Sequence, residues 1–133
     1  MPAAPTRPHV AALTAALTGA GLTVLPGGQG TPVPPCVVLW PTPGEPDGSS
    51  LGSLDDLLEV EVTTVACGTT TDQALWVSDK VTAALHRAAL TVAGRIVDPV
   101  LLVDAAPAQR DDSLATPIQS AATRWRITSR PAP

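Results

Sequence analysis

Two stretches of the chain carry apolar residues at helical spacing. The first begins at Pro8 and ends at the segment Gly19-Ala20-Gly21. Its largest apolar side chains are Val10, Leu13 and Leu17. The second opens at Thr70, with Gln73 three positions later, an arrangement typical of a capping box. It runs to about Ala89, and its apolar stripe consists of Ala74, Val77, Val81, Ala84, Leu85 and Ala88. The pattern predicts one helix in each stretch.

Between and after these helices, six short apolar segments indicate strands, at residues 22–25, 36–40, 57–67, 91–97, 100–103 and 120–129. Two of them alternate. In 57–67 one face carries Leu58, Val60, Val62, Thr64 and Ala66. In 120–129 the corresponding face carries Ala121, Thr123, Trp125 and Ile127. Such alternation predicts that one face packs in the core and the other meets water or a partner.

The order helix, strands, helix, strands predicts an α+β fold. Short links favour antiparallel pairing, so we expect a small, mostly antiparallel sheet with the two main helices packed on one face. A chain of 133 residues predicts a single domain over 1–133. Three prolines predict a flexible arm at 1–8, and a run of Gly, Pro, Ser and acidic residues predicts a long loop at 42–54. A second long connection is expected at 104–117.

Composition excludes several functions. Aromatic residues make up only 2% of the chain, all of it Trp, so a base-stacking platform for RNA is not expected. The sequence pI of about 4.8 argues against a surface that neutralises phosphates. The chain has no stretch of about eighteen apolar residues, so a membrane-spanning helix is not expected. Its first residues lack the pattern of a signal peptide.

One candidate for chemistry is Cys67, which lies just before the second helix. A thiol at a helix N-terminus can be acidified and act as a nucleophile, with His86 and Asp79 as the conceivable base and orienting acid. However, His86 lies near the other end of that helix, roughly 20 Å away at 1.5 Å per residue. Cys36 and Cys67 form no metal-binding motif, so we interpret both as small buried residues, with a disulfide as the alternative.

Two further motifs also lack the residues that their chemistry needs. The segment 27–30 is glycine-rich but lacks the Lys-Ser/Thr of a phosphate-binding loop, and prolines follow it where a helix would be needed. Glu59 and Glu61 share a strand face, but no histidine or second acidic pair accompanies them as a metal set. We therefore expect that the protein is not an enzyme. We also expect no catalytic, cofactor-binding or metal-binding residue and no cofactor.

Charge is unevenly distributed along the chain. No Lys or Arg lies between Pro8 and Asp79, a stretch that holds eight acidic residues, whereas no acid follows Ala115. An acidic edge of one subunit could meet a basic edge of the next in a head-to-tail ring. The alternative is a chance distribution. The candidate subunit-interface residues are Arg124, Arg126, Glu59, Glu61, Glu45, Asp47 and Leu51.

The element order also points to a family. A helix around Val10-Ala11-Ala12-Leu13 is followed by the strand Cys36–Trp40, a long loop, and the strand Leu58–Val65. The helix Gln73–Ala89 and a closing strand with Arg124-Trp125-Arg126-Ile127 complete it. This order, over roughly residues 8 to 130, resembles the tail terminator proteins of long-tailed bacteriophages and their small relatives at the head–tail junction.

The resemblance implies a structural virion protein: a homo-oligomeric ring, expected to be a hexamer, that caps the tail tube and joins it to the head-completion or connector proteins. Genomic DNA would pass through the ring without specific binding, and an acidic wall would repel its backbone. The protein would reside in the virion tail or neck, and in the host cytoplasm during assembly. Two alternatives stay open: another head–tail connector, stopper or tail-tube protein, and a small intracellular α+β enzyme or ligand-binding domain.

Overall fold

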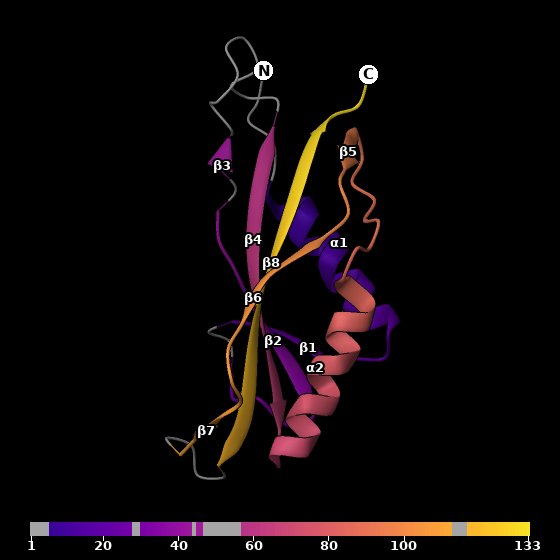
Figure 1. Ribbon diagram of the computed structural model, residues 1–133. Helices are drawn as coiled ribbons and strands as arrows, with labels where there is room; N and C mark the ends of the chain where they lie inside the picture. Colours follow the sequence, from indigo (N-terminus) through magenta and orange to yellow (C-terminus); the bar gives the residue numbers. More distant parts are fainter. Residues whose placement is uncertain (1–5, 28–29, 44, 47–56, 113–116) are drawn as a thin grey trace.

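The computed structural model describes residues 6–27, 30–43, 45–46, 57–112 and 117–133. Within these ranges the chain forms two helices and eight strands (Figure 1). The elements, in chain order, are α1 (Thr6–Gly19), β1 (Val24–Pro26), β2 (Cys36–Pro41), β3 (Glu45–Pro46), β4 (Leu58–Gly68), α2 (Thr71–Leu85), β5 (Arg95–Val97), β6 (Leu101–Ala105), β7 (Gln109–Asp111) and β8 (Ile118–Pro131). The predicted α+β class is confirmed.

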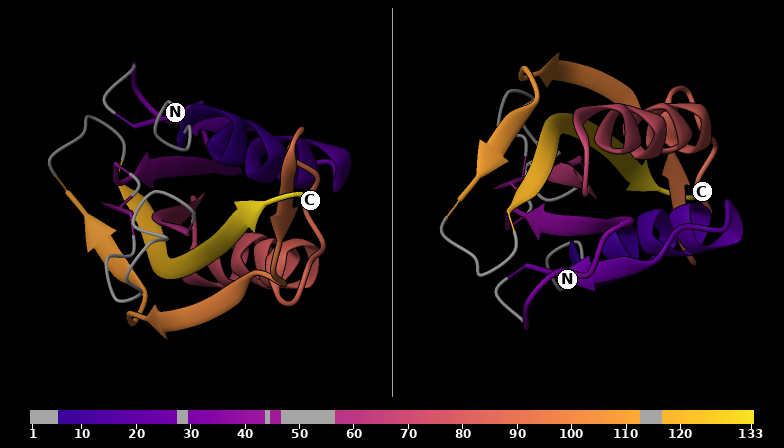
Figure 2. Two further views of the ribbon diagram at one scale, coloured as in Figure 1. Left: turned by 90° about the horizontal axis from the view of Figure 1, so that it is seen from above. Right: turned by 90° about the horizontal axis from the view of Figure 1, so that it is seen from below.

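Two long antiparallel strands, β4 and β8, form the centre of the sheet. Their register runs from Leu58 opposite Ser129 to Gly68 opposite Gln119. On its other edge β4 pairs with β2 and β3, while β8 pairs with β5, β6 and β7. All these pairs are antiparallel as predicted, but the edge strand β1 runs parallel to β2. Views along the strands show β1 and β2 on one side of β8 and β6 and β7 on the other (Figure 2).

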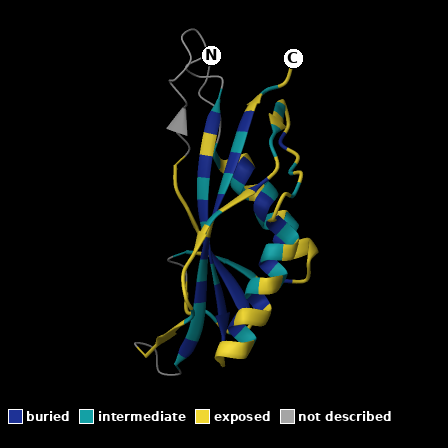
Figure 3. Ribbon diagram, viewed as in Figure 1, coloured by how far each residue is buried: buried dark blue, intermediate teal, exposed yellow. Residues whose placement is uncertain are grey.

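The main core lies between the sheet and the helices. Helix α2 packs against β4 and β8, and α1 packs against α2, β1 and β4. The two helices also contact each other, and in Figure 1 both are drawn to the right of β4. Figure 3 shows the buried stripes along both long strands. The predicted inward faces of β4 and β8 are confirmed, and the largest buried side chains include Trp125, Leu13, Leu17, Leu58, Leu85 and Ile127.

One polar network is built into this core. The Nε1–H of Trp125 donates to Oγ1 of Thr64 at 3.0 Å, and Thr64 donates to the carbonyl of Thr123 at 3.3 Å. All three residues are buried. Because a buried indole N–H needs an acceptor, Thr64 fixes the position of the one large aromatic ring in the core.

The predicted second helix is confirmed at its start and shorter at its end. Thr70 is the N-cap, and its side chain accepts a hydrogen bond from the backbone N–H of Gln73. The helix ends at Leu85 rather than Ala89, because Arg87 adopts a positive φ of 60°. The chain then pairs with the segment before β6. The backbone N–H of Arg87 donates to the carbonyl of Val100, and the N–H of Val100 donates to the carbonyl of Ala88.

The N-terminal and loop predictions need correction. Helix α1 begins at Thr6, so residues 6–8 are helical rather than part of an arm. Pro8 is tolerated there because the first turn of a helix lacks intrahelical N–H bonds. The chain after β2 also stays on the sheet: Thr42 N–H donates to the Glu61 carbonyl at 2.9 Å, and β3 pairs with β4. Residues 1–5 of the predicted arm and residues 44 and 47–54 of the predicted loop lie outside the described residues.

The remaining strand boundaries also differ from the predictions. The connection expected at 104–117 contains the end of β6 and the strand β7, which extend the edge of β8. Strand β8 is longer than expected, whereas β1 and β5 are shorter. Propensity alone does not fix such short edge strands, because their pairing depends on the neighbour they meet. Neither α1 nor α2 is long and apolar enough to cross a membrane.

Candidate functional site

Three of the charged residues that sequence analysis singled out meet on the face of β4 and β8 that lies opposite their buried stripes. Arg126 on β8 lies beside Glu59 and Glu61 on β4, with Nε–Oε1 and Nη2–Oε2 distances of 3.0 and 3.8 Å. The register places Glu61 directly opposite Arg126. Two residues of the acidic stretch, Glu59 and Glu61, are therefore paired with Arg126 of the basic C-terminal part within one chain, since β4 and β8 are neighbours.

The other arginines of β8 have partners in the same chain too. Arg124 Nη2 lies 2.6 Å from Asp104 Oδ2 on β6, and Arg130 Nη1 lies 3.1 Å from Asp98 Oδ1. All these pairs are partly exposed, so each contributes about 0.2–1 kcal/mol. The arrangement holds the edge segments on β8 and leaves less unpaired charge for a partner than the sequence suggested.

Three candidate interface residues come from the predicted loop. Glu45 lies in β3, and its Cα is opposite that of Glu59. Asp47 and Leu51 lie outside the described residues.

Exposed apolar side chains form a second candidate surface, which sequence analysis missed. Leu75 and Trp76 are adjacent on α2 and are 47% and 50% exposed. The ammonium of Lys80 lies 4.6 Å from the ring centroid of Trp76. The helical pattern contained this signal: Ala74, Val77, Val81 and Leu85 define the buried stripe, and both Leu75 and Trp76 fall outside it. Such a pair of large apolar groups is a candidate contact for a partner protein.

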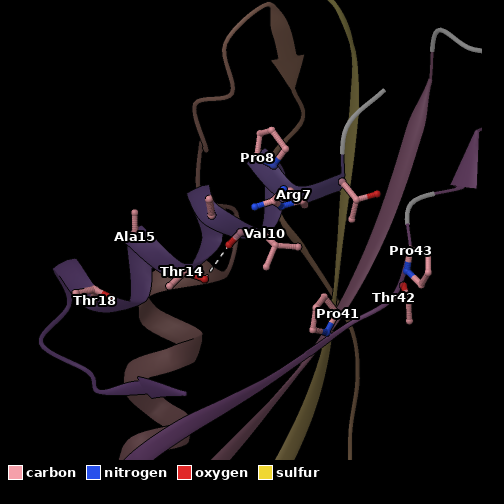
Figure 4. Close-up of a pocket in the computed structure, with 11 residues that line it drawn as sticks. Arg7, Pro8, Val10, Thr14, Ala15, Thr18, Pro41, Thr42 and Pro43 are labelled. Carbon is pink, nitrogen blue, oxygen red and sulfur yellow. Dashed lines mark hydrogen bonds between the residues drawn. The ribbon is translucent and has the colours of Figure 1, made fainter. Parts of the chain in front are cut away.

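An open groove of about 1200 Å³ lies between α1 and the end of β2 (Figure 4). Val10 and Thr14 line its helix side, and Pro41 and Thr42 line its strand side. Thr14 donates its hydroxyl hydrogen to the Val10 carbonyl at 2.8 Å, so it presents its methyl group and little free polar capacity. Mostly apolar walls suit packing against another apolar surface.

The two cysteines lie directly opposite each other. Cys36 begins β2, Cys67 lies in β4, and both are buried free thiols. Burial is the main cause that raises the pKa of Cys67 to about 12, and the neighbouring Cys36 and Asp111 add to it. A thiol with this pKa is protonated at neutral pH and is a poor nucleophile. His86 caps the far end of α2 and is therefore placed badly to act as its base.

Metal ligands do not assemble in the part of the chain described by the structure. No group of three or more His, Cys, Asp or Glu side chains converges there. Glu59 and Glu61 form ion pairs with Arg126 instead. The features of the described surface that remain as candidates are the ion-paired strands β4 and β8, the exposed apolar residues of α2 and the groove beside α1.

The sequence matches no described protein family and no curated protein. The fold, however, is similar to that of a solved chain from the "Virion of native gene transfer agent (GTA) particle". The two share 17% sequence identity with a TM-score of 0.59, and the match covers 90% of this chain and 92% of the other. The similarity therefore extends over the whole fold rather than one supersecondary motif.

Proposed function

We propose that this chain is a structural virion protein, a tail terminator that forms a ring at the end of a phage-like tail tube. The observation that carries the proposal is the fold similarity to a chain of a gene transfer agent virion, which spans nearly the full length of both chains. The helix and strand order over residues 8 to 130, interpreted independently from the sequence, supports the same assignment.

The described surface supports a role in assembly. Several large apolar side chains are more than a third exposed, among them Leu75 and Trp76 on α2 and Leu101 and Leu102 on β6. Strand β6 is nearly all exposed and lies at an edge of the sheet beside β8. A ring would cover such groups, because adjacent subunits bury surface that an isolated subunit leaves in water.

In this ring the charged residues have a different role from the one their sequence positions suggest. Arg124 and Arg126 are already paired with Asp104, Glu59 and Glu61 in the same chain. An intersubunit contact through them requires exchange of partners, so we assign the main binding energy to apolar contacts. Glu45, Asp47 and Leu51 remain proposed contacts to the adjacent subunit, the tube or the connector.

Sedimentation of the purified full chain, combined with negative-stain electron microscopy, tests the proposal directly. A terminator is expected to give closed rings, with six subunits as the expected number. With purified tail-tube protein present, these rings should bind the tube end and stop its growth. The second result separates a terminator from another ring-forming neck protein.

Three other outcomes favour the alternatives. Open stacks that grow with protein concentration would favour a tail-tube protein. Rings that bind the connector but never the tube end would favour a stopper. A monomer at all concentrations, alone and with tube protein, would overturn ring assembly and favour an enzyme or a ligand-binding domain.

A further inference from the structure

Cys36 and Cys67 occupy directly opposed positions on neighbouring antiparallel strands. Opposed residues in such a pair have Cα atoms about 4.5–5.5 Å apart. Disulfides span Cα separations of about 4.4–6.8 Å, so this backbone geometry lies within their range. Opposed side chains also leave the sheet on the same face, which brings the two sulfur atoms together rather than on opposite sides.

The surroundings of the pair keep the thiols close and dry. Both belong to a small apolar cluster with Val38 and Ile118, on the face of the sheet away from the main core. Burial is the main cause that raises the pKa of Cys36, and a side-chain contact with Cys67 opposes that effect. The two thiols are thus contact neighbours that remain protonated at neutral pH.

We propose that Cys36 and Cys67 form a dithiol site that a low-molecular-weight disulfide converts into a cross-strand disulfide. In the first exchange the thiolate of Cys36 attacks the small disulfide, forms a mixed disulfide and releases one small thiolate. In the second the thiolate of Cys67 attacks the Cys36 sulfur, forms the internal S–S bond and releases the second small thiolate. The two protons lost by the cysteines end on these thiols, and the small disulfide is the species reduced.

Cys36 is the natural entry point for this reaction. It is the first residue of β2, at the end of the β2–β4 ladder, whereas Cys67 is flanked by ladder pairs on both sides of β4. Strand ends open more readily than strand centres, so transient opening of β2 exposes Cys36 first. Because both thiols are buried, the reaction should be slow and limited by that opening.

The product would be a covalent clip across the β2–β4 pair. Positions 36 and 67 are 31 residues apart, and the closed loop contains β3 and the whole connection between β2 and β4. Such a bond restricts the unfolded chain and raises thermal stability. This inference stands on the β2–β4 register and is independent of the proposed ring.

The test uses the folded full chain, incubated with excess oxidised glutathione in mildly alkaline buffer and followed by intact mass spectrometry. We expect the mass to fall by two hydrogen atoms, with no residual thiol alkylated by N-ethylmaleimide after unfolding. Peptide mapping should link the segments that contain Cys36 and Cys67. The midpoint of thermal unfolding should rise by about 5–10 °C and return after treatment with dithiothreitol.

The single variants Cys36→Ser and Cys67→Ser are matched controls, since each keeps one thiol and should lose the upward thermal shift. Two results overturn the proposal. One is a stable adduct with a glutathione on each cysteine and no internal bond. The other is a native chain that keeps two alkylatable thiols while the urea-unfolded chain is oxidised in the same period.

Discussion

The Nε2 atom of His9 lies 2.6 Å from the Oγ atom of Ser129, which joins the first turns of α1 to the end of β8 across 120 positions of sequence. Both side chains are buried. Arg95 on β5 donates from Nε to the same Oγ at 3.0 Å and from Nη2 to the Ser129 carbonyl at 2.9 Å. Ser129 therefore connects α1, β5 and β8 through directional hydrogen bonds, which apolar contacts do not provide.

Ser129→Ala should lower the free energy of unfolding by about 1–3 kcal/mol, because it removes the buried hydroxyl that His9 and Arg95 share. Urea denaturation followed by circular dichroism measures the change. Thr128→Ala, at the neighbouring half-buried position on the other face, is the matched control and should cost less. Equal losses in the two variants would show that the hydroxyl contributes no specific stability.

Thr64→Val should also destabilise the chain by about 1–3 kcal/mol, although valine has nearly the same shape as threonine. The reason is that Nε1–H of Trp125 loses its acceptor inside the core. Thr63→Val changes the half-buried outward-facing neighbour and should have a smaller effect. Tryptophan fluorescence gives a second readout, since Trp125 is the buried one of the three tryptophans. A stability equal to that of the unmodified chain would contradict this account.

Arg126→Glu should weaken the isolated chain, because it places a third carboxylate beside Glu59 and Glu61. The expected loss is about 1 kcal/mol at low salt and less at high salt, since partly exposed charges are screened. Arg126→Gln, which removes the charge without reversing it, should cost less. A salt-independent loss in the urea midpoint would point to packing of the arginine stem instead.

Trp76→Ala should leave the stability of the isolated chain within about 0.5 kcal/mol, because half of the side chain is in water. If the proposed ring uses the α2 patch, the same change should shift sedimentation from rings towards monomers. Val33→Ala removes another highly exposed apolar group and serves as the control. Rings of unchanged stability in Trp76→Ala would exclude this patch from the interface.

Cys67 should make stability depend on pH in the alkaline range. Its folded pKa of about 12 lies above the ordinary value of 9.0, so the unfolded chain loses the thiol proton first. The free energy of unfolding therefore falls as pH rises above about 9, and the slope should be smaller in Cys67→Ala. Urea denaturation at a series of alkaline pH values checks this; identical slopes would indicate that the thiol titrates normally.

The elements with strong periodicity could be predicted from the sequence. Alternation in β4 and β8 identified their buried faces, and the Thr70 cap located the start of α2. Short edge elements such as β3 and β7 could not be predicted, because their few residues become strands only through pairing with β4 and β8. The end of α2 was also missed, since the positive φ of Arg87 depends on its pairing with Val100.

The candidate site was harder to predict, for a related reason. Sequence position separates Glu61 from Arg126, and that separation suggested two edges of opposite charge. Register makes them direct neighbours instead. Likewise, Cys36 and Cys67 are 31 positions apart, and the sequence left a disulfide between them only as an alternative, because their proximity depends on the pairing of β2 with β4. By contrast, the exposure of Leu75 and Trp76 could have been predicted from the helical stripe, although the sequence analysis missed it.

The pairing of β8 with four other strands has a consequence for biosynthesis. Strands β4, β5, β6 and β7 all precede β8 in the chain, and each hydrogen-bonds to it. While the ribosome has not yet released residues 118–131, these four strands lack their common neighbour. The sheet is therefore expected to form only after β8 has left the ribosome, and nascent chains halted before Ile118 should be substrates for chaperones and proteases.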